Sequence, residues 1–217
     1  MASAIIFLPL LGFLFCFFLG HSFSFRVSQI ITTTFLFIAT LFSWIIFFKY
    51  LDIKDTEVYI IFNWLKSGSF SVNWSIRLDS LTTTMFIVVT TVSACVHLYS
   101  IEYMKEDASK TRFMGYLSLF TFFMLVLVSS NNLLQMFFGW EGVGLASYLL
   151  IGFWYHKNSA NNAAIKAFVV NRIGDFAFAL GIVGVFFIFG SINFDVIFSN
   201  SNNFLNHKIS FIGINLP

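Results

Sequence analysis

The sequence predicts an all-α integral membrane protein with six transmembrane helices. Hydrophobic residues make up 58% of its 217 residues and charged residues only 10%, whereas a soluble domain carries about a quarter charged residues. Six apolar runs approach the roughly 20 residues that a helix needs to cross the hydrocarbon core of a bilayer. Only two prolines interrupt the chain. With so little charge the chain cannot cover itself with a water-facing surface, so lipid is its natural solvent.

The six apolar runs follow one another along the chain. Residues 4–19, 30–48, 81–98, 113–128, 133–154 and 163–189 make them up. No lysine or arginine precedes Arg26, whereas a secretory signal peptide begins with basic residues. We therefore expect the first run to be a retained helix. The apolar stretch 209–216 is too short to span a bilayer and predicts the beginning of a seventh helix.

Polar connectors separate the runs. The longest, residues 50–79, alternates polar and apolar residues around two tryptophans. This pattern is typical of a short β-hairpin or an interfacial flap whose tryptophans lie among lipid headgroups. The connector 155–162 ends in Ser159 and two asparagines, which we expect to cap the next helix. Residues 191–208 are rich in Asn and Ser and predict a surface loop.

The basic residues do not orient the chain in the membrane. Six spans divide the connectors into two sets, and each set holds five cations, so the positive-inside comparison gives no preference. The first set is Arg26, Lys105, Lys110, Arg112 and Lys157, and the second is Lys49, Lys54, Lys66, Arg77 and Lys208. A net charge of +2 also gives no basic face for nucleic acid.

The cysteines and histidines predict neither a metal site nor nucleophilic catalysis. Cys16 and Cys95 lack a CxxC neighbour and a histidine at ligand spacing, so we expect buried, unreactive thiols. His97 closes the third run and is either a proton relay or, as a lone histidine near a membrane boundary, an interfacial residue. The 32 phenylalanines are spread evenly, which indicates an AT-rich coding genome such as many mitochondrial ones.

Four ionisable residues lie inside the apolar runs. Glu141 is the ninth residue of the fifth run, close to mid-membrane, and Lys166, Arg172 and Asp175 lie in the sixth run. A charge at the bilayer centre costs at least about 2.5 kcal/mol, so we expect these side chains to face protein or internal water. Carboxylates and amines in such positions form proton relays. The sequence therefore predicts a proton site built from these four residues.

Three of these four charges also have a structural interpretation. Arg172 and Asp175 share a helix face and form either a simple ion pair or part of the relay. Lys166, near the start of its run, either extends its amine to the headgroups or serves the relay, because a buried lysine loses its proton readily. Glu141 has no opposite charge within a helical turn. Its partner therefore comes from another helix or from water.

Small residues surround Glu141. They are Gly139, Gly142, Gly144, Ala146 and Ser147. Such surfaces let helix backbones approach closely in lipid, which predicts that this helix is interior.

Residues 138–151 read FGWEGVGLASYLLI. This segment resembles the signature of chain 5 of NADH:ubiquinone oxidoreductase (respiratory complex I), a family similar to the large subunits of Mrp-type cation/proton antiporters. Residues 167–175, AFVVNRIGD, resemble the helix that follows it. Residues 77–81 and 96–100 resemble the entry and exit of the family's third helix, and residues 112–123 resemble its fourth. The resemblance extends over nearly the whole chain.

The resemblance implies a proton-translocating subunit in the membrane arm of NADH:ubiquinone reductase, in the mitochondrial inner membrane. It implies that Glu141 is a key protonatable residue and that Lys166, Arg172 and Asp175 belong to the same hydrophilic axis. Flavin and iron–sulfur clusters are expected in partner subunits, with no cofactor and no redox chemistry in this chain. The alternatives are an Mrp-type sodium/proton antiporter subunit and a non-pumping structural part of the membrane arm.

The resemblance also implies a division of the chain and a missing part. Residues 1–112 would hold the first three helices with the 50–79 loop, and residues 113–217 the first part of the proton-translocation domain. Members of the family continue for many more helices, including a broken helix with a central lysine, whereas this chain ends at Pro217. We therefore expect a second polypeptide to supply the remaining helices; a fragment is the alternative.

Overall fold

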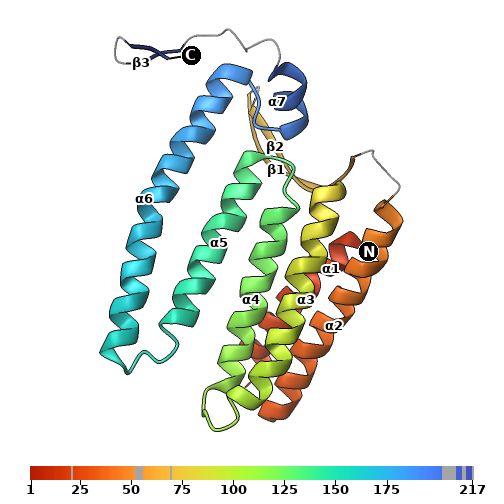
Figure 1. The fold of residues 1–217 in the computed structure, drawn as a ribbon, viewed down its shortest axis with the longest axis vertical. Coiled ribbons are helices and arrows are strands. Elements are labelled where there is room, and N and C mark those ends of the chain that lie inside the picture. The colour runs from red at the N-terminus through yellow and green to blue at the C-terminus, as the bar shows by residue number, and fades with distance from the viewer. Residues whose placement is uncertain (21, 52–55, 69, 202–208, 212–213, 217) are drawn as a thin grey trace.

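The computed structural model shows a bundle of six long helices with a β-hairpin at one end (Figure 1). The structure describes residues 1–20, 22–51, 56–68, 70–201, 209–211 and 214–216. The long helices are α1 (Ala2–Leu14) continued by the π-helix η1 (Phe15–Leu19), α2 (Phe25–Tyr50), α3 (Ser80–Tyr103), α4 (Lys110–Val128), α5 (Leu133–Ile151) and α6 (Asn158–Phe189). Within the described ranges, six helices are long and apolar enough to cross a membrane, which confirms the predicted fold class and number of spans.

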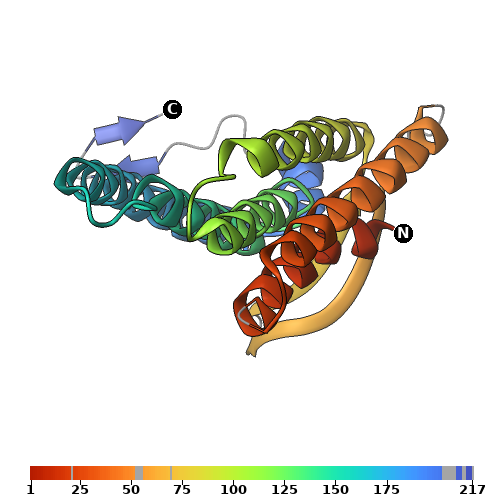
Figure 2. The same ribbon diagram turned by 90° about the horizontal axis from the view of Figure 1, so that it is seen from below.

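Helix α4 lies at the centre of the bundle. It packs against α1, α2, α3 and α5, and α6 packs on α5. Seen from below (Figure 2), α5 and α6 therefore lie to one side of α4, and α1 and α2 lie to the other. The core forms where α1, α3 and α4 meet, around the fully buried Ile5, Phe86 and Leu125. By contrast, only 11% of the apolar window of α6 is buried within the chain.

Side-chain caps fix the first turns of two helices. Asp79 accepts a hydrogen bond from the amide of Thr82 at 2.7 Å at the start of α3. Asn132 accepts one from the amide of Gln135 at 2.8 Å at the start of α5. Such caps satisfy amides that have no partner within the helix.

The start of α6 differs from the prediction. The helix begins at Asn158, and its N-cap residue, Lys157, makes no side-chain cap bond. Ser159 and the two asparagines that we expected to cap the helix are therefore inside it. The apolar pattern marks the part of a helix that lies in hydrocarbon, whereas α6 continues past it into polar sequence.

The predicted hairpin between the second and third spans is confirmed. Strand β1 (Glu57–Ser67) pairs antiparallel with β2 (Phe70–Leu78). The side chain of Gln135, on α5, holds β2 as a further strand would: its Oε1 accepts from the amide of Ser75 at 3.0 Å, and its Nε2 donates to the carbonyl of Ser75 at 2.8 Å. The hairpin is thus fixed to the helix that carries Glu141.

The tryptophans of the hairpin pack on protein. The rings of Trp64 and Trp74 lie edge to face with centroids 5.2 Å apart. The ring of Phe138 on α5 lies 5.8 Å from Trp64 and 5.1 Å from Trp74. This aromatic cluster is the second link between the hairpin and α5.

The C-terminal part does not form the seventh helix that we expected. Helix α7 (Phe194–Asn200) lies within the predicted loop 191–208, of which residues 202–208 lie outside the described ranges. Strands β3 (Ile209–Phe211) and β4 (Ile214–Leu216) then pair antiparallel. The apolar residues here alternate with polar ones, which is the period of a strand and not of a helix.

Candidate functional site: an ion network between α5 and α6

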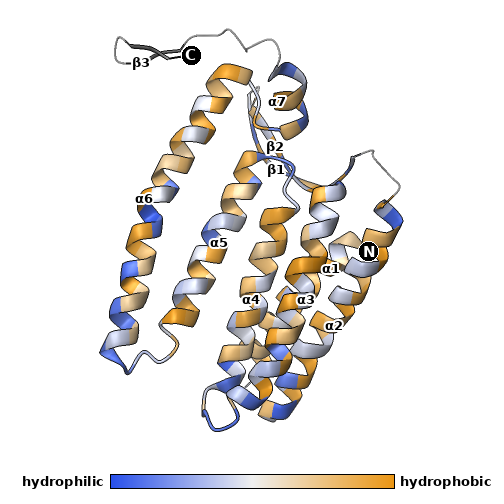
Figure 3. Cartoon of the chain, in the orientation of Figure 1, coloured by the Kyte–Doolittle hydropathy of each residue, from blue (hydrophilic) through white to orange (hydrophobic). Residues whose placement is uncertain are grey.

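The predicted site residues lie half-way along two neighbouring helices. Glu141 is the ninth of the 19 residues of α5, and Arg172 is the fifteenth of the 32 residues of α6. Colouring by hydropathy shows hydrophilic segments at these heights, between apolar parts of the same helices (Figure 3). The charges therefore lie well inside their spans.

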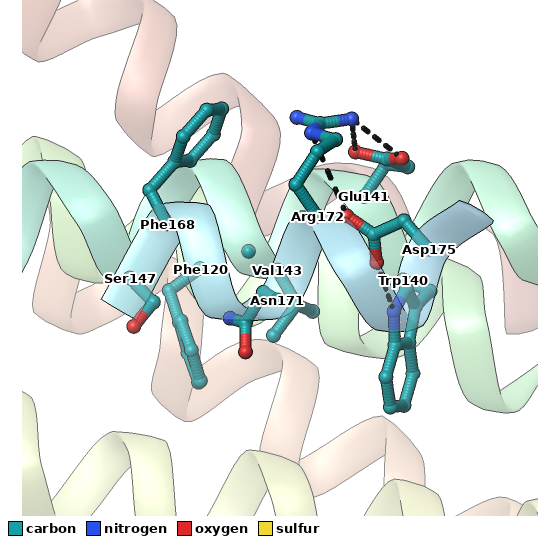
Figure 4. A pocket seen from close by; sticks show the side chains of 10 residues that line it. Phe120, Trp140, Glu141, Val143, Ser147, Phe168, Asn171, Arg172 and Asp175 are labelled. Atoms are coloured by element: carbon teal, nitrogen blue, oxygen red, sulfur yellow. Dashed lines mark hydrogen bonds and ion pairs between the residues drawn. The ribbon is translucent and has the colours of Figure 1, made fainter. Parts of the chain in front are cut away.

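Arg172 bridges the two helices (Figure 4). Its Nη1 donates to both oxygens of Glu141, at 2.8 Å each, and its Nε lies 3.7 Å from Oδ2 of Asp175. Nε1 of Trp140 donates to the other oxygen of Asp175 at 2.8 Å. Because Trp140 and Glu141 are consecutive on α5 and Arg172 and Asp175 are three apart on α6, the four side chains close a ring of contacts between the helices.

This geometry bears on the interpretations that the sequence leaves open. Arg172 and Asp175 are in contact, as a simple ion pair requires, but the shorter contacts of Arg172 go to Glu141. The partner of Glu141 thus comes from another helix. Lys166 is not brought into the network: it is exposed on α6 and forms no ion pair within the part of the chain that the structure describes.

A cavity of about 220 Å³ lies beside the network. This volume is well above the roughly 10–15 Å³ that a cavity needs to hold one water molecule. The wall also includes Phe120, Val143, Gly144, Ser147, Phe168 and Asn171. The Arg172 guanidinium lies over the ring of Phe168, 4.8 Å from its centroid.

Exposure of the charged side chains changes steeply across the site. The side chain of Asp175 is 8% exposed, that of Glu141 25% and that of Arg172 51%. Asp175 is therefore the enclosed end of the network, and Arg172 is its open end.

Sequence reasoning missed two polar residues of the site. Trp140 holds Asp175, and Asn171 lines the cavity. Both are direct neighbours of predicted site residues. A tryptophan inside a span carries an N–H that finds no water to bind in hydrocarbon and so needs an acceptor in the protein, and this was the available signal.

The small residues of α5 fall into two groups. A Cβ at Gly139 would lie 2.7 Å from the backbone of Leu127 on α4, and one at Gly142 would overlap the ring of Phe123. These two glycines therefore permit the close contact of α4 and α5 that the sequence predicts. A Cβ at Gly144 would meet nothing within 4 Å, because this glycine faces the cavity.

Two other sequence interpretations are wrong. His97 is fully buried, not interfacial: its Nδ1 lies 2.9 Å from the carbonyl of Ser93, and its Nε2 lies 3.1 Å from Oγ of Ser118. Cys95 is exposed on α3, whereas Cys16 is buried as expected. The period of α3 places Cys95 on the outer face and His97 on the inner one.

The fold and the site together define a class: membrane-spanning helix bundles that hold an ion network at mid-depth between two helices. The family model described as NADH-Ubiquinone oxidoreductase (complex I), chain 5 N-terminus matches residues 64–114. The model described as NADH:quinone oxidoreductase/Mrp antiporter, TM matches residues 130–216. The chain belongs to the chain 5 family of NADH:ubiquinone oxidoreductase, which is related to the Mrp antiporters.

Curated relatives are similar over nearly all of this chain. NADH-ubiquinone oxidoreductase chain 5 of Chondrus crispus is 49% identical over 98% of this chain and 32% of its own length. NADH-quinone oxidoreductase subunit L of Rhodobacter capsulatus is 51% identical over 98% of this chain and 30% of its own. Chain 5 of Arabidopsis thaliana is 48% identical over 97% and 32%. The chain thus spans about a third of the length of these relatives.

A solved structure shares the fold at low identity. The archaeal membrane-bound sulfane sulfur reductase, a respiratory membrane complex, contains a chain with a TM-score of 0.75 and 17% identity, matched over 88% of this chain and 38% of that one. At this identity the likeness concerns the fold alone.

Proposed function

We propose that this chain is part of a proton-translocating membrane-arm subunit of NADH:quinone oxidoreductase and that Glu141 carries the proton. The observation that supports this most is the network of Glu141, Arg172 and Asp175 beside a cavity in the middle of two spans. Charges in such a position are expensive in lipid and typical of proton pathways. The relatives named above bear the name of this enzyme complex.

The charges of the network suit the exchange of one proton. Arg172 stays protonated, because a guanidinium keeps its charge in proteins. With both carboxylates ionised, the three groups carry a formal charge of −1, and one proton on a carboxyl group neutralises them. Glu141 is more exposed than Asp175 and shares the cavity with Asn171 and Ser147. We therefore assign the arriving proton to Glu141 and not to Asp175, which lines the same cavity but is more enclosed.

The test is Glu141→Gln in the assembled complex, with proton uptake measured in proteoliposomes that oxidise NADH. We expect proton translocation to fall at least about tenfold, the scale on which a positioned acid or base acts, while native gels show normal assembly. Glu106→Gln, which removes an exposed carboxylate from the loop between α3 and α4, serves as the control and should pump normally. If Glu141→Gln also pumps normally, the chain has a structural role and the proposal is wrong.

We further propose the partners and the membrane that this function requires. The chain would assemble with the other membrane-arm subunits in the mitochondrial inner membrane. Flavin and iron–sulfur clusters would lie in partner subunits, and residues 113–217 would begin the translocation domain while residues 1–112 flank it. Lys166 would serve as a further charge on the axis.

An Mrp-type antiporter subunit is the second candidate, because the model that matches residues 130–216 covers both families. Native separation of gently solubilised membranes, followed by mass spectrometry of the band that oxidises NADH, distinguishes the two. Recovery of this chain with flavin and iron–sulfur subunits supports the complex I proposal. Recovery in a complex without them supports the antiporter.

A further inference from the structure

Unpaired cations gather at the lower end of the bundle in Figure 1, where the α1–α2, α3–α4 and α5–α6 turns lie. Each of four cations there lies over an aromatic ring, and none forms an ion pair with a described residue. The four are Arg26, Lys110, Arg112 and Lys157. Aromatic and basic side chains together are typical of the boundary between hydrocarbon and water. This end of the bundle therefore presents positive charge at a membrane surface.

Arg112 is the member of this group whose guanidinium reaches into the protein. Its Nη2 donates to the carbonyl of Phe153 at 3.1 Å, and its Cζ lies over the rings of Phe153 and Tyr155, 4.8 and 5.2 Å from their centroids. Its Nε is buried and has no acceptor within the described residues. A guanidinium has five N–H donors and no acceptor. Only one of the five is used by a described residue, so the remaining N–H donors of Arg112 can bind an anion.

Arg112 also lies in the wall of two cavities, one on each side of α4. The first, of about 530 Å³, lies between η1 and the start of α4, and its wall includes Phe13, Phe17, Ser109, Thr111 and Tyr116. The second, of about 440 Å³, lies between α4, α5 and α6, and its wall includes Tyr116, Tyr148, Tyr155 and Asn161. No carboxylate is among the lining residues of either.

The nearby carboxylate, Asp107, is already bound. Its Oδ1 accepts from the amide of Ser109 at 2.7 Å, and its Oδ2 accepts from Nε1 of Trp154 at 2.9 Å. It does not lie within ion-pair distance of Arg112. The positive charge of Arg112 is thus not neutralised by a direct contact with a described residue.

We propose that Arg112 binds the phosphate of an anionic phospholipid, whose headgroup occupies the cavity between η1 and α4 and whose acyl chains lie along Phe13 and Phe17. The guanidinium fork fits two phosphate oxygens, and basic pockets between membrane helices bind anionic headgroups. The hydroxyls of Ser109, Thr111 and Tyr116 add donors around the phosphate. Phe17 is 63% exposed, so the cavity opens toward lipid. This inference needs the chain to span a membrane but does not depend on proton transfer.

Photolabelling of the assembled complex tests the site. The complex is reconstituted in phosphatidylcholine vesicles that contain either photoactivatable phosphatidylglycerol or photoactivatable phosphatidylcholine, and the adducts on this chain are mapped by mass spectrometry. Labelling of residues 13–19 is normalised to labelling at Leu41, an exposed residue of α2 that lines neither cavity. We expect the phosphatidylglycerol probe to label residues 13–19 at least about tenfold more than the phosphatidylcholine probe.

Three variants then test whether Arg112 causes the preference for the phosphatidylglycerol probe. Arg112→Gln should abolish it, and Arg112→Lys should keep part of it. Lys105→Gln, which removes an exposed cation that is paired with Glu102, should keep it fully. If Arg112→Gln does not assemble, the two probes can still be compared on the wild type and on Arg112→Lys, and that comparison tests whether Arg112 binds the anionic headgroup.

Four outcomes would overturn the proposal. These are equal labelling by both probes, an unchanged preference in Arg112→Gln, no label on residues 13–19, and complete competition by inorganic phosphate. The third would mean that another chain covers the cavity, and the fourth that the site takes a free phosphate.

Discussion

Arg172 holds Glu141 through a single nitrogen of its guanidinium group. Nη1 bridges both carboxylate oxygens, so the two nitrogens of a guanidinium edge are not both used. A carboxylate held in this way is less firmly oriented than one that accepts two parallel bonds from both nitrogens of the fork.

Asp175 accepts a hydrogen bond from Trp140, and Trp140→Phe tests what this bond contributes. The change removes the bond from Nε1 to Asp175 but keeps an aromatic ring beside Phe178. Because hydrogen bonds to charged groups contribute about 1.5–3 kcal/mol, we expect the melting temperature of the purified complex to fall and proton translocation to decrease severalfold. The matched control is Trp154→Phe, which removes a similar bond to Asp107, a residue of the turn between α3 and α4. If the control impairs proton translocation as much as Trp140→Phe, the bond to Asp175 has no special role.

The sequence predicts which charged residues form the site but not which of them pair with one another. Glu141, Arg172 and Asp175 stand out because each interrupts an apolar run. Which carboxylate Arg172 binds depends on the rotation of α5 about its axis relative to α6, and no spacing within one helix contains that angle. The role of Trp140 could not be predicted for another reason. An aromatic residue in a span is normally a packing residue, and the sequence does not show that an acceptor lies beside its N–H.

Among the elements, the contact between α4 and α5 depends on two glycines. Gly139→Ala would bring a Cβ to 2.7 Å from the backbone of Leu127. Since backbone cannot move aside as a flexible side chain does, we expect a loss of about 1–3 kcal/mol, measured as a lower melting temperature of the complex. Gly144→Ala is the matched control. Its Cβ meets nothing within 4 Å, and alanine favours helix, so stability should stay the same or rise. Equal losses in both variants would contradict this account of the packing.

The cap of α3 predicts a pH dependence at the hairpin end. Burial alone would raise the pKa of Asp79, but the bonds from Thr82 and Arg77 outweigh it and hold this pKa below its ordinary value of 3.8. The ionised carboxylate therefore stabilises the folded state above about pH 4, and this contribution is lost as the pH falls through the lowered pKa. Hydrogen exchange at the Thr82 amide, corrected for intrinsic rate, should rise as the pH falls in that range.

Two variants distinguish protonation of Asp79 from the effects of low pH on other groups. Asp79→Asn cannot ionise, so it should show no such rise in exchange at Thr82. Glu102→Gln, which changes an exposed carboxylate at the far end of α3, should behave as the wild type. An identical pH response in Asp79→Asn would show that another group is responsible.

For the whole molecule, hydropathy predicts the spans but not where they end. All six runs became helices, because lipid leaves an isolated backbone little alternative. The polar start of α6 was missed because a helix can continue beyond hydrocarbon. Residues 209–216 were wrongly predicted to begin a helix. That prediction rested on their apolar content alone, whereas the apolar residues of Ile209–Phe211 and Ile214–Leu216 alternate with polar ones, as in a strand. The second and third spans are joined by a hairpin as predicted, since its alternation is visible in the sequence.

The position of Glu141 half-way along α5 also has an electrical consequence. A proton that reaches this carboxylate from either face crosses about half of the membrane's electric field. Moving one charge across the whole field is worth about 2.3 kcal/mol per 100 mV, so half of it is worth about 1.2 kcal/mol. If Glu141 carries the proton, as proposed, each 100 mV across the membrane shifts the ratio of its protonated to its ionised form about sevenfold, upward for one entry side and downward for the other. Any membrane that this chain spans would thus set the protonation of the site by its voltage as well as by its pH.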